Sequence, residues 1–187
     1  MKSNEIEKLV EKAKGRDPDA FTQLMQHYMK DMYRVALAVL MNDEDAADAI
    51  SETILTCFEK IGTLKKNYYF KTWLTRILLN KCYDIRKDRK HYVSMDAEKA
   101  ELVGRIDADD TRVDVSMAGM VSEDDCNSEL KEALFALDEK YRVLITMYYL
   151  EGYSIAEISG LLKIPKSTVQ TRLWRGRKKL GEYLRGK

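Results

Sequence analysis

Residues 154–179 restrict the possible folds of this chain more than any other stretch, because they predict two helices separated by a tight break. The first helix, residues 155–162, has apolar side chains at helical spacing. Ser154 stands just before it, and Glu157 follows three residues later, as in a capping box. The break falls at Pro165, because proline fits the first turn of a helix but not its interior.

The second helix is predicted to begin at Lys166 or Ser167, to end near Tyr183 and to have two chemically different faces. At about 100° per residue, the inward face consists of Val169, Leu173, Gly176, Leu180 and Leu184. The opposite face consists of Thr168, Thr171, Arg172, Arg175, Lys178 and Lys179. Hydroxyls and arginines in this arrangement suit a recognition helix in a major groove. A helix-turn-helix is therefore favoured over a surface helix with a solvated basic face.

The composition favours helices and offers no catalytic chemistry. The 187 residues include 2 prolines, 9 glycines and 34% charged residues. Cys57, Cys82 and Cys126 match neither a zinc spacing nor an even disulfide framework, so we expect the first two to be small core residues. His27 and His91 are too isolated to indicate a metal site. We therefore expect no enzymatic activity, no cofactor, no metal and no small-molecule substrate.

The chain lacks the signals of membrane insertion and export. No apolar run approaches the ~18 residues of a membrane span, and the N-terminus has no signal-peptide core. We therefore expect a cytoplasmic protein.

Charge is distributed unevenly along the chain. Residues 1–95 hold 17 Lys and Arg against 14 Asp and Glu, residues 96–129 hold 3 against 11, and residues 130–187 hold 12 against 6. The acidic middle is poor in large apolar residues and has no sustained periodicity. This pattern predicts an all-α fold of two small helical domains joined by a flexible acidic linker over residues 96–129. The first domain is expected to be a helical bundle and the second the helix-turn-helix.

The first domain is predicted to contain several amphipathic helices. A short first helix ends near Gly15, and Asp17 with Pro18 starts the next. Two further helices are expected over residues 46–61 and 71–90, separated by a polar loop.

The helix over residues 71–90 has a second face that differs from an ordinary solvated surface. Its apolar face consists of Leu74, Leu78, Leu79, Cys82 and Ile85. The other face consists of Trp73, Arg76, Asn80, Tyr83 and Lys87, and the basic run over residues 86–90 extends it. Unpaired bases stack on aromatic rings, amides bond base edges, and basic residues bind phosphates. The alternative, in which Trp73 is buried between helices, stays open here.

Three segments resemble extracytoplasmic-function (ECF) sigma factors, the small bacterial subunits that direct RNA polymerase to promoters. FKTWLTRILLNKCYDIRKDRK resembles their promoter-melting helix, which recognises the −10 element. EDAADAISETILTCFEKI resembles the helix that binds core polymerase. LDEKYRVLITMYYLEGYSIAEISGLLKIPKSTVQTRLWRGRKKL is similar to the −35-recognition domain. The resemblance spans nearly the whole chain in the family's order, apart from the acidic middle.

The resemblance implies a role for particular residues of this sequence. The −10 contacts would come from Tyr69, Phe70, Trp73, Arg76, Asn80, Tyr83 and Lys87, with Asn80 matching the position that contacts a flipped base. The −35 contacts would come from Lys166, Ser167, Thr168, Thr171, Arg172, Arg175 and Lys178. Core polymerase would bind Asp48, Ser51, Glu52 and Leu55.

The same resemblance implies the partners. They are core RNA polymerase, promoter DNA and a regulatory anti-sigma factor, which is often membrane-attached. The resemblance also implies a role in regulating transcription during the stress response. The acidic linker would thread into the polymerase near the RNA exit path. Three positions depart from the family's usual residues: Ser51, where Gln is common, Lys163, where Gly is common, and Gln170, where a basic residue is common.

Two other classes of protein are consistent with part of the sequence. A helix-turn-helix repressor or activator would explain residues 154–179, but it would normally dimerise and would not need the Trp73–Asn80 face. A protein-interaction module would leave the segregated basic face of the second helix unexplained.

Overall fold

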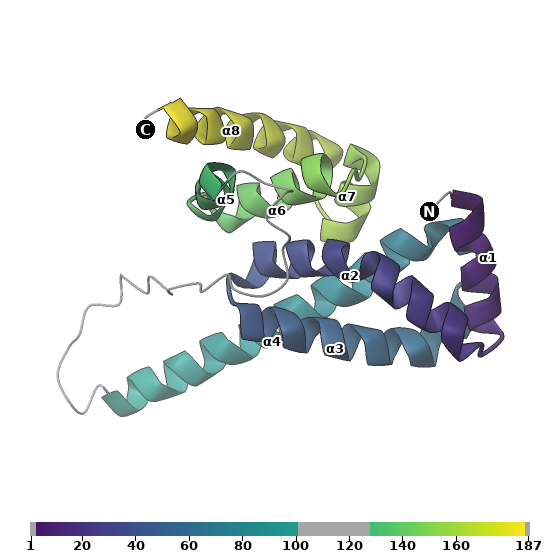
Figure 1. The fold of residues 1–187 in the computed structure, drawn as a ribbon. Helices are drawn as coiled ribbons and strands as arrows, with labels where there is room; N and C mark the ends of the chain where they lie inside the picture. The colour runs from purple at the N-terminus through teal and green to yellow at the C-terminus, as the bar shows by residue number, and fades with distance from the viewer. Residues whose placement is uncertain (1–2, 101–127, 186–187) are drawn as a thin grey trace.

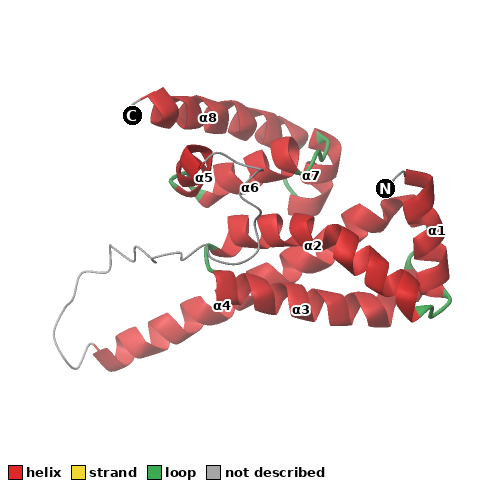
Figure 2. Cartoon of the chain, in the orientation of Figure 1, coloured by secondary structure: helices red, strands yellow, loops and turns green. Residues whose placement is uncertain are grey.

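The computed structural model describes residues 3–100 and 128–185, and every regular element within these ranges is helical (Figure 1, Figure 2). The prediction of an all-α fold is therefore confirmed. The expected linker lies mostly outside the described residues, as does Cys126. Cys57 and Cys82 are both fully buried, which confirms them as core residues.

The N-terminal bundle is built from the helices α1 to α4. In Figure 1, α2, α3 and α4 lie alongside one another, and α1 crosses the bundle near one end. The core between them is formed by aliphatic side chains such as Leu24, Val35, Leu74 and Leu78. The elements are α1 (Ser3–Lys14), α2 (Pro18–Leu40), α3 (Asp43–Lys60), the 3₁₀ turns η1 (Ile61–Thr63) and η2 (Asn67–Tyr69), and α4 (Phe70–Ala100).

Side-chain caps determine where two of these helices begin. The Asp17 carboxylate accepts hydrogen bonds from the backbone N–H groups of Asp19 and Ala20, both at 3.0 Å, and α2 starts at the following proline as predicted. The Asn42 side chain accepts from the Asp45 N–H at 2.9 Å. The prediction that α3 starts at Ala46 was wrong, because this cap and three acidic residues in the first turn stabilise an earlier start.

Helix α4 is longer than predicted. It continues past the expected end at residue 90 and past the expected domain boundary at residue 95, to Ala100. Residues 91–100 contain neither glycine nor proline and include Ala, Glu, Lys and Met, which favour helix. The final turns project beyond the bundle in Figure 1.

The C-terminal domain is built from α5 to α8. The two helices of the helix-turn-helix, α7 and α8, begin where the sequence predicts, which confirms the motif. Ile158 of α7 and Val169 of α8 are fully buried and belong to the core together with Leu144 and Met147. The elements are α5 (Ser128–Phe135), α6 (Glu139–Ile145), the π-helical turn η3 (Thr146–Leu150), α7 (Ile155–Leu162) and α8 (Lys166–Arg185).

The turn between α7 and α8 is held by local hydrogen bonds. At the start of α7, the Ser154 hydroxyl accepts from the Glu157 N–H, and the Glu157 carboxylate accepts from the Ser154 N–H at 2.9 Å. At its end, Lys163 adopts the left-handed conformation, with φ of 54°, at the position where glycine is usual. The Ser159 hydroxyl donates to the Ile164 carbonyl at 2.7 Å. The turn therefore forms without the glycine.

The C-terminal domain packs against α2 and α4 of the bundle (Figure 1). Arg142 of α6 is buried at this contact. Its Nε donates to the Ala38 carbonyl of α2 at 2.8 Å, and its Nη1 donates to the Leu137 carbonyl at 2.7 Å. One guanidinium therefore joins the two halves of the protein.

Two glycines of the helix-turn-helix are expected to respond oppositely to substitution. A Cβ on Gly176 of α8 would lie 2.9 Å from Ile145 Cδ1 and 3.2 Å from Tyr141 Cβ, because α8 crosses α6 closely there. Gly176→Val should therefore lower the free energy of unfolding by about 1–3 kcal/mol through overpacking. A Cβ on Gly160 of α7 would meet no atom within 4 Å, so Gly160→Ala should raise it by about 0.5–1 kcal/mol.

Urea unfolding followed by circular dichroism measures both changes. Equal effects of the two substitutions would contradict the close crossing of α6 and α8.

Candidate nucleic-acid interface

The predicted −10 face lies on α4 and combines exposed polar groups with half-buried rings. Arg76, Asn80 and Lys87 are exposed, so their polar groups are accessible from solvent. Trp73 and Tyr83 are half-buried. The Trp73 ring packs on the core with its centroid 5.9 Å from that of a neighbouring phenylalanine. The ring of Trp73 is therefore held in place from below while part of its surface stays accessible.

Phe70 is the residue of the predicted −10 set that does not fit a surface role. Its side chain is 1% exposed and packs against the rings of Tyr28 and Trp73, with centroid distances of 5.5 and 5.9 Å. Phe70 is the first residue of α4, and its ring packs against α2. Its aromatic side chain is therefore explained by core packing.

The loop before α4 instead presents two tyrosines. Tyr68 and Tyr69 are exposed, with ring centroids 4.1 Å apart, and Lys66 Nζ lies 5.7 Å from the centroid of the Tyr68 ring. Asn67 anchors the loop to α1, because its amide donates to the Glu11 carboxylate at 2.8 Å. The resemblance assigns the loop over residues 65–70 to the pocket for the flipped base, but Tyr68 was not named individually in the −10 set, although a tyrosine pair beside two lysines is a signal for a stacking surface.

Part of the basic run at residues 86–90 is engaged with protein. Arg86 forms an ion pair with Glu139 of α6, and its guanidinium lies 5.0 Å from the centroid of the Tyr83 ring. Burial, followed by the Glu139 charge, raises the pKa of Tyr83, so the phenol stays neutral. Arg89 pairs with Asp45 at 2.9 Å. Lys87 is consequently better placed for a phosphate than either arginine.

The predicted −35 face lies on α8 and points away from the domain core. Lys166, Ser167, Thr171, Arg175 and Lys178 are all exposed. The Thr171 hydroxyl donates to the Ser167 carbonyl at 2.9 Å, which leaves its oxygen able to accept a further hydrogen bond. The two remaining residues of the set, Thr168 and Arg172, are half-buried.

Two further residues of α8, Trp174 and Leu184, are exposed although neither belongs to the predicted −35 set. Trp174 was not predicted as a site residue, yet it is 57% exposed and lies one turn after Gln170 on the flank of the polar face. The sequence signal for this residue was a large aromatic side chain that lies outside the predicted inward face of the helix. Leu184, predicted to pack inward, is 40% exposed, because at about 100° per residue it has turned some 60° away from Val169.

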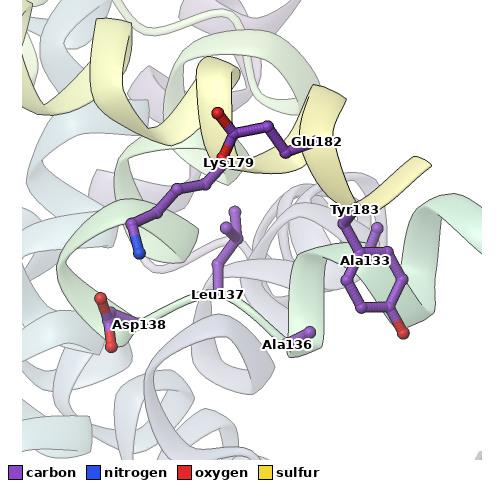
Figure 3. Close-up of a pocket in the computed structure, with 7 residues that line it drawn as sticks. All are labelled: Ala133, Ala136, Leu137, Asp138, Lys179, Glu182 and Tyr183. Atoms are coloured by element: carbon purple, nitrogen blue, oxygen red, sulfur yellow. The ribbon is translucent and has the colours of Figure 1, made fainter. Parts of the chain in front are cut away.

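Lys179 is exposed, as its place on the polar face predicts, but its side chain extends over the surface of its own domain. It lines an open pocket of about 490 Å³ between α5 and α8, where its side chain extends toward Asp138 (Figure 3). Its ammonium lies 5.8 Å from the centroid of the Tyr141 ring. Lys179 therefore lies at the edge of the polar face, beside the contact of α8 with α6. The pocket is lined by Ala133, Ala136, Leu137, Asp138, Lys179, Glu182 and Tyr183.

The predicted polymerase-binding residues form a row on the outer surface of α3. Asp48, Ser51, Glu52 and Leu55 are all exposed, and Leu55 is 66% exposed. Phe58, one turn further, is also exposed and was missed, although its spacing of three residues from Leu55 was a signal. Exposed large apolar side chains in a row commonly mark a protein contact.

Two family models match this chain, in the order of the two halves described above. Residues 24–92 match Sigma-70 region 2, and residues 127–180 match Sigma-70 region 4. The two halves therefore have the organisation of a sigma-70-type transcription initiation factor.

A relative that covers almost the whole chain identifies the subfamily. The ECF RNA polymerase sigma factor SigW of Bacillus subtilis (strain 168) is 32% identical over 186 residues, covering 96% of this chain and 97% of the relative. The RNA polymerase sigma-H factor of Pseudomonas aeruginosa is 25% identical over 182 residues, covering 95% and 93%. This chain belongs to the ECF RNA polymerase sigma factor family. It directs transcription initiation by recognising promoters together with RNA polymerase.

Solved structures share the fold. CnrH, in complex with the cytosolic domain of CnrY, has a TM-score of 0.65 at 22% identity, with 97% of each chain covered. The sigma factor RpoE, in complex with the anti-sigma factor NepR from Bartonella quintana, has a TM-score of 0.66 at 20% identity, covering 88% of this chain and 96% of that one. Among the described residues of the present chain, no helix combines the length and apolarity needed to cross a bilayer.

The two tryptophans are expected to differ in solvent access. A Trp174→Phe variant keeps only the half-buried Trp73, and a Trp73→Phe variant keeps only the exposed Trp174. Acrylamide should quench the second variant more strongly, and its emission should lie at longer wavelength. Equal quenching of the two variants would contradict the packing of Trp73 on the bundle core.

Proposed function

We propose that this sigma factor contacts its promoter through one face of α4 and one face of α8, and core RNA polymerase through α3. The observation that carries this proposal is the pair of exposed polar faces, one on each of two helices that belong to different domains. Each face presents the groups that its proposed target requires, and each falls within the matching sigma region.

The α4 face is proposed to bind the unpaired −10 strand. The exposed Asn80 amide would bond the edge of a flipped base, and Trp73 with Tyr69 would stack against bases. Arg76 and Lys87 would neutralise phosphates on either side of that base. Tyr83 belongs to the same surface, whereas Phe70 acts by supporting the Trp73 ring from the core.

The α8 face is proposed to enter the major groove of the −35 element. Arg175 and Thr171 lie one turn apart and would contact base edges. The remaining groups of the set would bind phosphates: Lys166, Ser167, Thr168, Arg172 and Lys178. The exposed Trp174 would add apolar contact with the sugar-phosphate backbone at the edge of the groove.

The outer row on α3 is proposed to dock on core polymerase. Leu55 supplies an apolar contact at the centre, and Asp48, Ser51 and Glu52 surround it with polar groups. Phe58 would extend the apolar part by one turn.

The organisation of the chain follows from these roles. Residues 1–95 would form the unit for polymerase and −10 binding, residues 96–129 the acidic tether, and residues 130–187 the −35 unit. An anti-sigma factor would regulate the protein. This is supported by the solved structures, in which RpoE is bound to the anti-sigma factor NepR and CnrH to the cytosolic domain of CnrY. The protein would act in the cytoplasm and have no catalytic activity of its own.

Run-off transcription tests the proposed DNA contacts. Added to cognate core polymerase and fragments of the source genome, the protein should produce discrete new transcripts. Asn80→Ala and Arg175→Ala should each weaken these transcripts by about 5- to 150-fold, because a base contact contributes about 1–3 kcal/mol. Arg177→Ala is a matched control, since it removes the same charge from another face of α8.

Two results would overturn these assignments. One is the absence of new transcripts with the cognate core. The other is an Arg177→Ala loss as large as that of Arg175→Ala.

Free protein should bind promoter DNA weakly. Each domain offers a small contact, and the two gain effective concentration only when polymerase holds both in place. Fluorescence anisotropy of a labelled promoter fragment should show much tighter binding with core than without it. Lys178→Ala should reduce the slope of log affinity against log salt by about 1. Tight binding without core would instead indicate a helix-turn-helix repressor.

A further inference from the structure

A cluster of polar groups lies where the C-terminal domain meets the bundle. Glu151, just after η3, has a side chain that is 1% exposed and lies 3.3 Å from the Arg34 guanidinium of α2. The backbone carbonyl of Glu151 accepts a hydrogen bond from Lys71 Nζ of α4 at 2.7 Å. Two residues on, the buried Tyr153 hydroxyl shares a hydrogen bond of 2.5 Å with Thr75 of α4. Each of these contacts joins one half of the protein to the other.

A second carboxyl group belongs to the cluster. Asp31 of α2 lies 3.3 Å from Lys71 Nζ, and its carboxyl group is placed to share a hydrogen bond with that of Glu151 when one of the two is protonated. Burial, then the Asp31 charge and that hydrogen bond, raise the pKa of Glu151 to about 7, and Arg34 opposes the shift. The charged and titratable groups around this site are Asp31 and Arg34 on α2, Lys71 on α4, Tyr153 beside Glu151, and Tyr28 on α2 bordering Tyr153.

The packed arrangement is incompatible with simultaneous contact to both promoter elements. Tyr83 of the proposed −10 face and Arg172 of the proposed −35 face line the same pocket of about 410 Å³. The positions in the names of the −10 and −35 elements place them about 25 base pairs apart, roughly 85 Å at 3.4 Å per pair. The two domains must therefore separate before both faces engage DNA. This step of the reasoning rests on the proposed function.

We propose that Glu151 is a proton-dependent latch between the two domains. With its carboxyl group protonated, Glu151 donates a hydrogen bond to Asp31 and holds the protein closed. Loss of that proton places a second negative charge beside Asp31 in a buried contact, a repulsion that the Arg34 guanidinium offsets only in part, and the domains separate. The open form then presents both DNA-binding faces at once.

The direction of the pH dependence follows from the two states of Glu151. In the open form Glu151 is exposed and its pKa returns toward the ordinary 4.5, whereas in the closed form it is about 7. The closed form therefore binds the proton more tightly and is favoured at low pH. The ratio of closed to open protein should fall by up to about tenfold per pH unit between these two values and level off above about pH 7.

Small-angle X-ray scattering of the full chain tests the latch without DNA or polymerase. At constant ionic strength, the radius of gyration should increase as the pH rises from 5 to 7 and then stay constant. Glu151→Gln, which resembles the protonated side chain, should stay compact at every pH. Glu59→Gln, which changes an exposed carboxylate on α3, is the matched control and should follow the unmodified protein.

A second variant keeps the test decisive if Glu151→Gln fails to fold. Asp31→Asn removes the neighbouring carboxylate, which lowers the pKa of Glu151 in the closed form toward its open-form value, so the expansion with pH should be smaller. Circular dichroism at each pH verifies that helix content is retained. A radius of gyration that does not change with pH, or a Glu151→Gln protein that expands like the unmodified one, would overturn the latch. Run-off transcription is independent of this result, so failure of the latch and failure of the proposed function are distinguishable.

Discussion

The buried guanidinium of Arg142 is the interaction on which the arrangement of this protein depends. A buried charge is costly unless its hydrogen bonds are satisfied, and Arg142 satisfies them with backbone carbonyls from both halves of the chain. The Leu137 carbonyl ties it to the start of α6, and the Ala38 carbonyl ties it to α2. Because α8 packs closely on α6 at Gly176, this one side chain relates the helix-turn-helix to the bundle.

The proposed binding surfaces lie on helices whose opposite faces form the core. Leu74 and Leu78 hold α4 in the bundle, which leaves Asn80 and Arg76 outside. On α3, Cys57 lies on the core side, where burial raises the pKa of its thiol to about 12 and keeps it protonated. The same helices therefore contribute to the core on one side and carry the proposed recognition surface on the other.

Contacts between the domains involve a residue that the sequence analysis assigned to phosphate binding. Arg86, which lies in a basic run suited to phosphates, pairs with Glu139 of the other domain. Arg34 and Lys71 are occupied at Glu151 in the same way. Charge in a basic run thus stabilises domain packing in this structure. The domain contact and the proposed −10 face consequently lie on neighbouring parts of α4.

The sequence by itself determined the helices and the helix-turn-helix, because caps such as Asp17 and Ser154 and the periodicity of apolar residues act within a few positions. It also carried the resemblance that identified the family. Only the tertiary structure decided which side chains are accessible: Phe70 is enclosed in the core, Trp73 is half-buried, and Trp174 is exposed. Accessibility depends on what packs against a residue from distant parts of the chain, and local spacing contains no record of those neighbours.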